Sequence, residues 1–394
     1  MQEKSPILAT ASLTLDLPPS CLQFYPSDAT YLVVGTYNLR RDGPEEVPSG
    51  KPQTRNGSLL AFRLDDDHIE KVQIISQPSA LLDLRFHPRQ GEHRGILAVV
   101  SSTGTLAIFK LDPYRSDRAP LQHLATSRCE GLSIDILFLQ CAWHPVLAHV
   151  IAVTTSTGLA RLLHLDHEWK IRSSTELDVG NSLEAWSIAL YPMTNAEDGG
   201  GHLATVYCGG DDSFLRYALC SWDADNASSE PNVVYPSVAV GGQHDAGITA
   251  ILPLPVYAMG GCRLVVTGSY DDRLRVFAIN DYDKLGGMKR LRLMCDSNLG
   301  GGVWRLDLVD VKLRGDASWQ IRILASCMHA GVRLVVITSE SDGLNWACKV
   351  EARFEQHKSM NYATHFVAME DSRRLRCVST SFYDKLLCLW DYHE

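Results

Sequence analysis

The sequence predicts an all-β chain folded as a seven-bladed propeller and closed into a ring by its N-terminal strand. The clearest unit lies between His244 and Asn280. Two apolar runs, Gly247–Leu254 and Leu264–Gly268, precede the polar turn Ser269–Asp272, and a third strand, Arg273–Ile279, follows at once. Period-two patterning with β-branched residues and a turn of Ser and Asp is typical of consecutive antiparallel strands.

The unit repeats along the chain at nearly even spacing. Aligning on the turn residue places the corresponding positions at Asn38, Thr103, Thr157, Asp212, Asp271, His329 and Asp384. Apolar strands precede and follow each turn, and helical periodicity of any length is missing from the sequence, which together favour a propeller. The predicted blades span residues 21–76, 80–128, 136–178, 183–240, 244–297, 301–357 and 361–392.

The two ends of the chain predict how the ring closes. The last unit has only three strands, Tyr362–Ala368, Leu375–Ser381 and Lys385–Tyr392, whereas the chain opens with an unpaired strand, Ala11–Leu17. We expect that first strand to complete the last blade, because an open ring would leave an unpaired strand edge. Residues 1–394 then form a single propeller domain.

Composition restricts the classes of function. The 394 residues are 45% apolar and carry a net charge of −9, with 46 acidic against 37 basic residues and no long basic cluster. Nucleic acid is therefore a disfavoured partner. The 11 cysteines contain no CxxC pair, which predicts reduced thiols rather than a disulfide framework or a zinc site. The N-terminus is no signal peptide and no apolar run reaches membrane-spanning length, so we expect a cytoplasmic monomer without membrane contact.

Familiar hydrolase and nucleotide-binding motifs are missing from the sequence. The nearest approach to a Gly-x-Ser-x-Gly elbow, Gly180–Glu184, fails at its last position, and the sequence contains no phosphate loop. We expect neither a cofactor nor a metal. An active site in this chain would be assembled from several blades at one mouth of the channel.

Two histidines are candidate proton acceptors. His329 stands where the repeat favours Asp, and an imidazole at a channel mouth could act as a general base. His244 precedes the innermost strand of the fifth unit, where a histidine commonly forms a hydrogen bond within its own blade. For both residues a purely structural role remains the alternative.

Aromatic and acidic residues are predicted to share one face of the ring. Gly300, Gly301 and Gly302 precede Trp304, and their backbone could adopt positive φ and present N–H groups to an oxyanion. Aromatic faces beside carboxylates suit a cationic ligand such as a quaternary ammonium group. The predicted binding residues are Trp186, Asp211, Tyr270, Gly301, Gly302, Trp304 and Tyr383. Each taken singly could instead serve packing.

The same stretches resemble a known family. Read in chain order they are Glu184–Trp186, Gly209–Asp212, His244–Gly247, Gly268–Asp271, Gly301–Arg305 (GGVWR), Cys327–Gly331 (CMHAG) and Ser381–Asp384 (SFYD). This series is similar to the blade signatures of diphthine methyl ester hydrolase, the WD-repeat enzyme of the diphthamide pathway. The resemblance is weaker in the first half of the chain. In the fourth unit the Trp222-Asp223 pair stands a few residues later than the repeat predicts, which leaves the strand register there open.

The resemblance implies a carboxylic ester hydrolase. Its substrate would be the methyl ester of the modified histidine on translation elongation factor 2, which carries a trimethylammonium group, and other enzymes of the pathway would be possible partners. The resemblance supplies no catalytic set, so we assign catalysis to His329, His244 and Glu184 from the residues themselves.

Several alternatives stay open at the level of the sequence. Attack by an activated water competes with a covalent nucleophile such as Ser326 or Cys327. A metal held by His244, His329 and a carboxylate is a further alternative. The rival function is a non-catalytic propeller that binds other proteins, since fold does not imply function.

Overall fold

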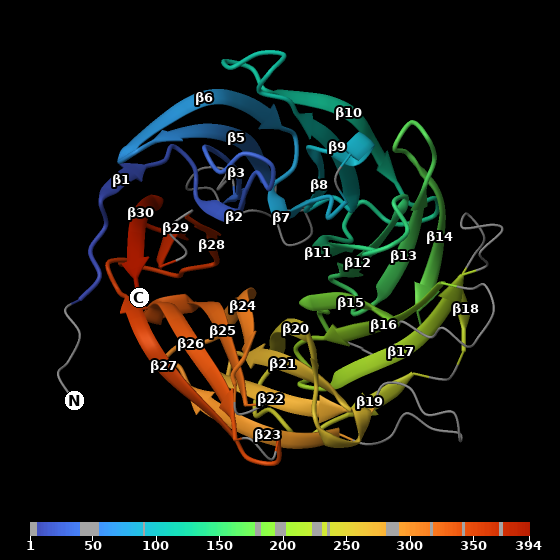
Figure 1. Cartoon of the computed structure of the whole chain (residues 1–394). Helices are drawn as coiled ribbons and strands as arrows, with labels where there is room; N and C mark the ends of the chain where they lie inside the picture. Colours follow the sequence, from blue (N-terminus) through green and yellow to red (C-terminus); the bar gives the residue numbers. More distant parts are fainter. Residues whose placement is uncertain are drawn as a thin grey trace, which may run out of the picture.

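The computed structural model shows seven β-sheets arranged as blades around a central channel (Figure 1). It describes residues 6–39, 55–89, 91–177, 183–193, 202–222, 231–234, 237–280, 291–315, 318–340, 343–369 and 373–394. The predicted seven-bladed propeller is confirmed.

The blades follow one another along the chain, and each runs from an innermost to an outermost strand. Blade one comprises β2 (Pro19–Phe24), β3 (Tyr31–Thr36), β4 (Asn38–Leu39), β5 (Arg55–Asp65) and β6 (His68–Gln77). Blade two comprises β7 (Leu81–Phe86), β8 (Ile96–Ser101), β9 (Thr105–Leu111) and β10 (Leu121–Arg128). Blade three comprises β11 (Phe138–Trp143), β12 (Val150–Thr155), β13 (Ala160–Leu165) and β14 (Ile171–Leu177).

The second half of the ring continues the same order. Blade four comprises β15 (Ser187–Met193), β16 (His202–Gly209), β17 (Leu215–Trp222), β18 (Asn232–Val233) and β19 (Val238–Val240). Blade five comprises β20 (Ile248–Tyr257), β21 (Arg263–Ser269), β22 (Arg273–Ile279) and β23 (Leu291–Asn298). Blade six comprises β24 (Val303–Leu313), β25 (Trp319–Cys327), β26 (Gly331–Ser339) and β27 (Trp346–Phe354). Blade seven comprises β28 (Ala363–Ala368), β29 (Arg374–Ser381), β30 (Leu386–His393) and β1 (Ala11–Thr14).

Three short 3₁₀ turns are the helical elements among the described residues, and none is long enough to cross a membrane. They are η1 (Gly91–His93), η2 (Met259–Gly261) and η3 (Met328–Ala330).

Apolar side chains between neighbouring blades form the core. One cluster, for example, joins Val266 and Val276 of blade five to Val303, Ile323 and Ala325 of blade six. The middle strands are buried on both faces, which explains their nearly continuous apolar sequence. Because every blade packs against two others, the innermost strands line one channel.

The N-terminal strand closes the ring as predicted. β1 lies beside β30 (Figure 1) and pairs with it antiparallel. Leu13 lies opposite Leu387 in this pairing. Ala11, Leu13 and Leu15 pack against the cluster shared by blades seven and one. The strand ends at Thr14, earlier than the expected Leu17. Leu15 continues the contact through a backbone hydrogen bond to Lys385, 2.8 Å long.

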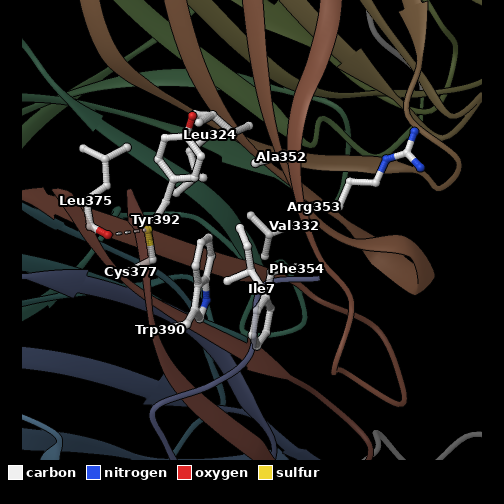
Figure 2. Close-up of a pocket in the computed structure, with 11 residues that line it drawn as sticks. Ile7, Leu324, Val332, Ala352, Arg353, Phe354, Leu375, Cys377, Trp390 and Tyr392 are labelled. Carbon is white, nitrogen blue, oxygen red and sulfur yellow. Dashed lines mark hydrogen bonds between the residues drawn. The ribbon is translucent and has the colours of Figure 1, made fainter. Parts of the chain in front are cut away.

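Residues before β1 cover a second seam, between blades six and seven. Figure 2 shows Ile7 beside Phe354 of β27 and Trp390 of β30 in an apolar pocket. The rings of Phe354 and Trp390 stack with centroids 4.8 Å apart and an interplanar angle of 4°. The N-terminal segment therefore fills a gap as well as completing a sheet.

Removing the first 17 residues is expected to lower thermal stability and cause aggregation, because it exposes the edge of β30 and uncovers this apolar surface. A matched pair of substitutions tests the same point with less disruption. Leu13→Asp, on the packed face of β1, should cost about 2 kcal/mol or more of unfolding free energy. Ser12→Asp, on the exposed face, should change little. Equal melting temperatures for the two variants would refute closure by β1.

Candidate functional site

A hydrogen-bond network inside blade five accounts for His244. The His244 ring is buried, with Nε2 2.7 Å from the Thr267 hydroxyl and Nδ1 3.2 Å from the Asp271 carboxylate. Burial, followed by the charge of Arg275, lowers the pKa of His244 to about 4. A neutral ring with both nitrogens engaged corresponds to the structural role that the sequence left as the alternative.

Blade seven carries the same kind of network. His357 Nε2 lies 2.7 Å from the Ser379 hydroxyl, which also accepts a hydrogen bond from Trp390 Nε1 at 3.0 Å. In the adjoining turn, Asp384 accepts a hydrogen bond from the Ser359 hydroxyl at 2.7 Å. Turn aspartates, histidine rings and strand hydroxyls thus connect the strands and turns within these two blades. They leave the channel mouth to other residues.

At that mouth two carboxyl groups and an indole meet. Glu184 and Trp186 lie just before β15, and Asp211 lies in the turn between β16 and β17. Trp186 Nε1 donates a hydrogen bond to Asp211 Oδ1 at 2.6 Å. The backbone N–H of Asp211 donates a hydrogen bond to the Glu184 carbonyl at 3.0 Å, which brings the two residues together. Desolvation raises the pKa of Asp211 and the negative charge of Glu184 raises it further, whereas the indole N–H lowers it. Asp211 therefore keeps its proton to higher pH than an ordinary aspartate.

A group of aromatic rings adjoins this pair. Trp304 of β24 is its centre, with ring centroids 5.3 Å from Trp186, 6.0 Å from Tyr270 and 5.0 Å from Tyr362. Burial raises the pKa of Tyr270, and the charge of Asp211 is the next cause, so the phenol stays protonated near the carboxyl pair. Residues from blades four, five, six and seven thus form one site, which we call the mouth site: Glu184, Trp186, Asp211, Tyr270, Trp304 and Tyr362.

Further rings lead from the mouth site toward blade one. The ring centroid of Phe382 lies 5.4 Å from that of Tyr362. The ring centroids of Tyr37 and Tyr383 lie 6.1 Å and 5.1 Å from that of Phe382, respectively. Tyr383, one of the expected binding residues, is 69% exposed at the outer end of this series. The structure thus connects it to the mouth site through Phe382 and Tyr362 rather than by direct contact with Trp304.

The glycines before Trp304 serve close packing. Positive φ is confined to Gly300, at 87°, so the expectation of left-handed backbone at all three glycines is wrong. Gly301 and Gly302 are buried, and an added Cβ would lie 2.9 Å from the Ala330 Cβ and 2.9 Å from the Met328 Sδ, respectively. The absence of side chains lets η3 approach the start of β24.

The remaining candidates lie around the mouth site. His329 is exposed on η3, the turn of blade six that corresponds to the Tyr270 turn of blade five. Ser326 and Cys327 are buried, and burial raises the pKa of the Cys327 thiol to about 12, which disfavours a thiolate nucleophile. Among the described residues, His, Cys, Asp and Glu side chains form no group of three that could hold a metal ion.

Reasoning from sequence missed Tyr362, Phe382 and Tyr37. A signal for Tyr362 was present, because an aromatic residue stands at the start of the innermost strand in three blades: Trp186 before β15, Trp304 in β24 and Tyr362 before β28. It also missed Gly247, where an added Cβ would lie 2.8 Å from Asp211 Oδ1. Only glycine leaves room there for the carboxyl group.

The seven blades, together with the hydrogen-bond networks of blades five and seven, define a WD-repeat β-propeller. The chain is 24% identical over 400 residues to the "Diphthine methyltransferase homolog" of Dictyostelium discoideum, covering 95% of this chain and 97% of that protein. It is 24% identical over 365 residues to the "Diphthine methyltransferase" of Schizosaccharomyces pombe, covering 91% and 90%. The chain is a homologue of these two proteins.

Two further comparisons concern the fold. The crystal structure of Saccharomyces cerevisiae Sqt1 superposes with a TM-score of 0.57 and 9% identity, covering 99% of this chain and 100% of that one, which supports the propeller fold alone. No family model matches the chain.

The arrangement predicts how the pKa of Asp211 responds to changes in its two neighbours. Glu184→Gln removes a neighbouring negative charge and should lower the pKa of Asp211, whereas Trp186→Phe removes the indole N–H and should raise it further. Carbon-13 NMR of the labelled aspartate carboxyls against pH measures both shifts. Glu176→Gln, on the outer strand of blade three, is the control. An Asp211 pKa that neither variant moves would contradict the carboxyl pair.

Proposed function

We propose that the chain is a carboxylic ester hydrolase of diphthamide biosynthesis, and that it removes the methyl ester from methylated diphthine on translation elongation factor 2. The observation that carries the proposal is the Glu184–Asp211 carboxyl pair beside the aromatic rings of the mouth site. Homology over nearly the whole chain to two diphthine methyltransferases supports the pathway. It also suggests other enzymes of that pathway as partners in the cytoplasm.

The carboxyl pair can supply both halves of an ester hydrolysis. One ionised carboxylate accepts a proton as the oxygen of water attacks the ester carbonyl carbon. The proton that Asp211 retains because of its raised pKa is then available to the methoxide when the bond between the carbonyl carbon and that oxygen breaks. Water and ester thus give a carboxylate, methanol and one proton. We assign the base to Glu184, with Asp211 as the proton donor.

The aromatic rings account for binding. Methylated diphthine carries a trimethylammonium group, which cannot donate hydrogen bonds and is best stabilised by aromatic faces and nearby negative charge. Trp186 and Tyr270 each pack against Trp304, and Trp186 also hydrogen-bonds to Asp211, so the three rings adjoin the carboxyl pair. We assign the cation to these rings, with Gly301 and Gly302 shaping the wall and Tyr383 contacting the protein substrate at the rim.

The proposed reaction differs in the acceptor of the methyl group from the reaction that the relatives' names describe. Those names specify methyl transfer. In the proposed reaction the methyl group leaves as methanol, and water supplies the new oxygen of the carboxylate.

Purified protein is expected to release methanol from ester-bearing elongation factor 2, which a non-catalytic propeller would not do. Glu184→Gln should lower kcat at least about a hundredfold, the usual size of general-base assistance. Glu176→Gln serves as the control with full activity. Methanol production and the mass of the modified histidine peptide are the measurements.

The same assay distinguishes Glu184 from His329, the candidate base on the neighbouring turn. His329→Asp restores the residue type that the repeat favours and should fold normally. Full activity in His329→Asp together with loss in Glu184→Gln supports the carboxyl pair. The reverse pattern would move the base to His329, and methanol release unaffected by either change would refute both assignments.

A further inference from the structure

We propose that Arg305 is a positioning residue, which holds Trp304 in the mouth site by means of an ion pair across the channel to Asp83. The proposal rests on the function proposed above only in so far as Trp304 binds substrate.

The ion pair joins blades that are not neighbours. Arg305 follows Trp304 on β24 of blade six, and its Nη2 lies 2.9 Å from Oδ1 of Asp83 on β7 of blade two. In the ring, β24 packs against β28 and β20, while β7 packs against β2 and β11. The side chains therefore meet across the channel. Their exposures of 8% and 2% show that solvent screens the pair little.

Asp83 is itself held firmly by its surroundings. Its Oδ2 accepts a hydrogen bond from the backbone N–H of Cys141 on β11 at 3.1 Å and lies 3.5 Å from Arg85 Nε. One carboxylate thus links blades two, three and six. Separating Arg305 from Asp83 would leave an uncompensated buried charge, which is strongly unfavourable. The Arg305 side chain is therefore held in place.

The backbone at Trp304 needs such an anchor. Val303 pairs with Cys327 and Arg305 pairs with Ser326, which leaves Trp304 as the extra residue of a β-bulge. A bulged residue lacks a ladder partner, and its side-chain direction depends on how the flanking residues are held. On one side the Thr249 hydroxyl of blade five donates a hydrogen bond to the carbonyl of Val303. On the other side the anchor is the Arg305–Asp83 pair.

A cavity adjoins Arg305 on the side away from the mouth site, and we infer that the ion pair keeps the Trp304 indole out of it. A cavity of about 440 Å³ lies farther down the channel, lined by Arg305 and Asp307 of β24 and by Ile188 of β15. Trp186 and Trp304 precede these lining residues along the two strands, so Arg305 stands between the aromatic rings and the cavity. Without the guanidinium group, the Trp304 indole has room to tilt away from the mouth site.

The test measures the environment of the Trp304 indole by fluorine NMR. In protein labelled with 5-fluorotryptophan, the fluorine NMR signal of Trp304 is assigned by its loss in Trp304→Phe. That signal should move or broaden in Arg305→Met and in Asp83→Asn. Arg322→Met is the control, because Arg322 is equally buried in blade six but pairs with Asp310, toward the other end of β24. If Arg305→Met does not fold, Arg305→Lys, which keeps the charge but loses the forked donor, carries the same test.

Kinetics then separate positioning from stability. Arg305→Met should raise KM about tenfold, because losing a cation–aromatic contact weakens substrate binding by about that factor. The value of kcat should stay within about twofold of the wild type. Adding Arg305→Met to Trp304→Ala should raise KM no further, because both changes remove the same contact. An unmoved Trp304 signal in folded Arg305→Met would overturn the proposal. A moved signal with unchanged KM would leave positioning intact and contradict substrate binding by Trp304.

Discussion

Closure of the ring by β1 and β30 is the interaction on which the rest of the structure depends. A seven-bladed ring has a defined channel only when its last blade is complete, and here the last blade takes its outermost strand from the start of the chain. Closure forces the innermost strands together. Glu184, Tyr270, Trp304 and Tyr362, which lie in four different blades, therefore share one site. Blade four supplies both carboxyl groups, and blades five, six and seven supply the rings beside them.

Ionisation of Asp211 in the mouth site opposes folding. Two carboxyl groups lie close together beside half-buried rings, and the pKa of Asp211 is raised. A raised pKa in the folded state means that the folded chain holds this proton more tightly than the unfolded chain. The stability that this group contributes is fully present below the unfolded pKa and is lost as pH rises through the folded pKa. The hydrogen-bond networks of blades five and seven, such as His357 with Ser379 and Trp390, do not include Asp211 and stabilise the folded chain separately.

Much of the fold could be predicted because each blade repeats a period-two pattern and ends in a recognisable turn. Ring closure followed from simple strand counting, in that the last unit lacked one strand and the chain began with a spare one. The mouth site was harder to predict, since residues distant in sequence meet only after closure. Trp186, Trp304 and Tyr270 were found because each lies beside a repeat signature, whereas Phe382 and Tyr37 become neighbours only where blades seven and one meet. The Arg305–Asp83 pair spans the channel and leaves no local pattern at all.

Hydrolysis at the mouth site is tested most directly by turnover in water enriched in oxygen-18. Attack by water on the ester carbonyl places one heavy oxygen in the carboxylate of the modified histidine on elongation factor 2 and leaves the methanol unlabelled. Mass spectrometry of the peptide and of the released methanol distinguishes the routes, and Glu184→Gln should abolish the incorporation. An unlabelled carboxylate, with the methyl group either in labelled methanol or on another acceptor, would contradict the account.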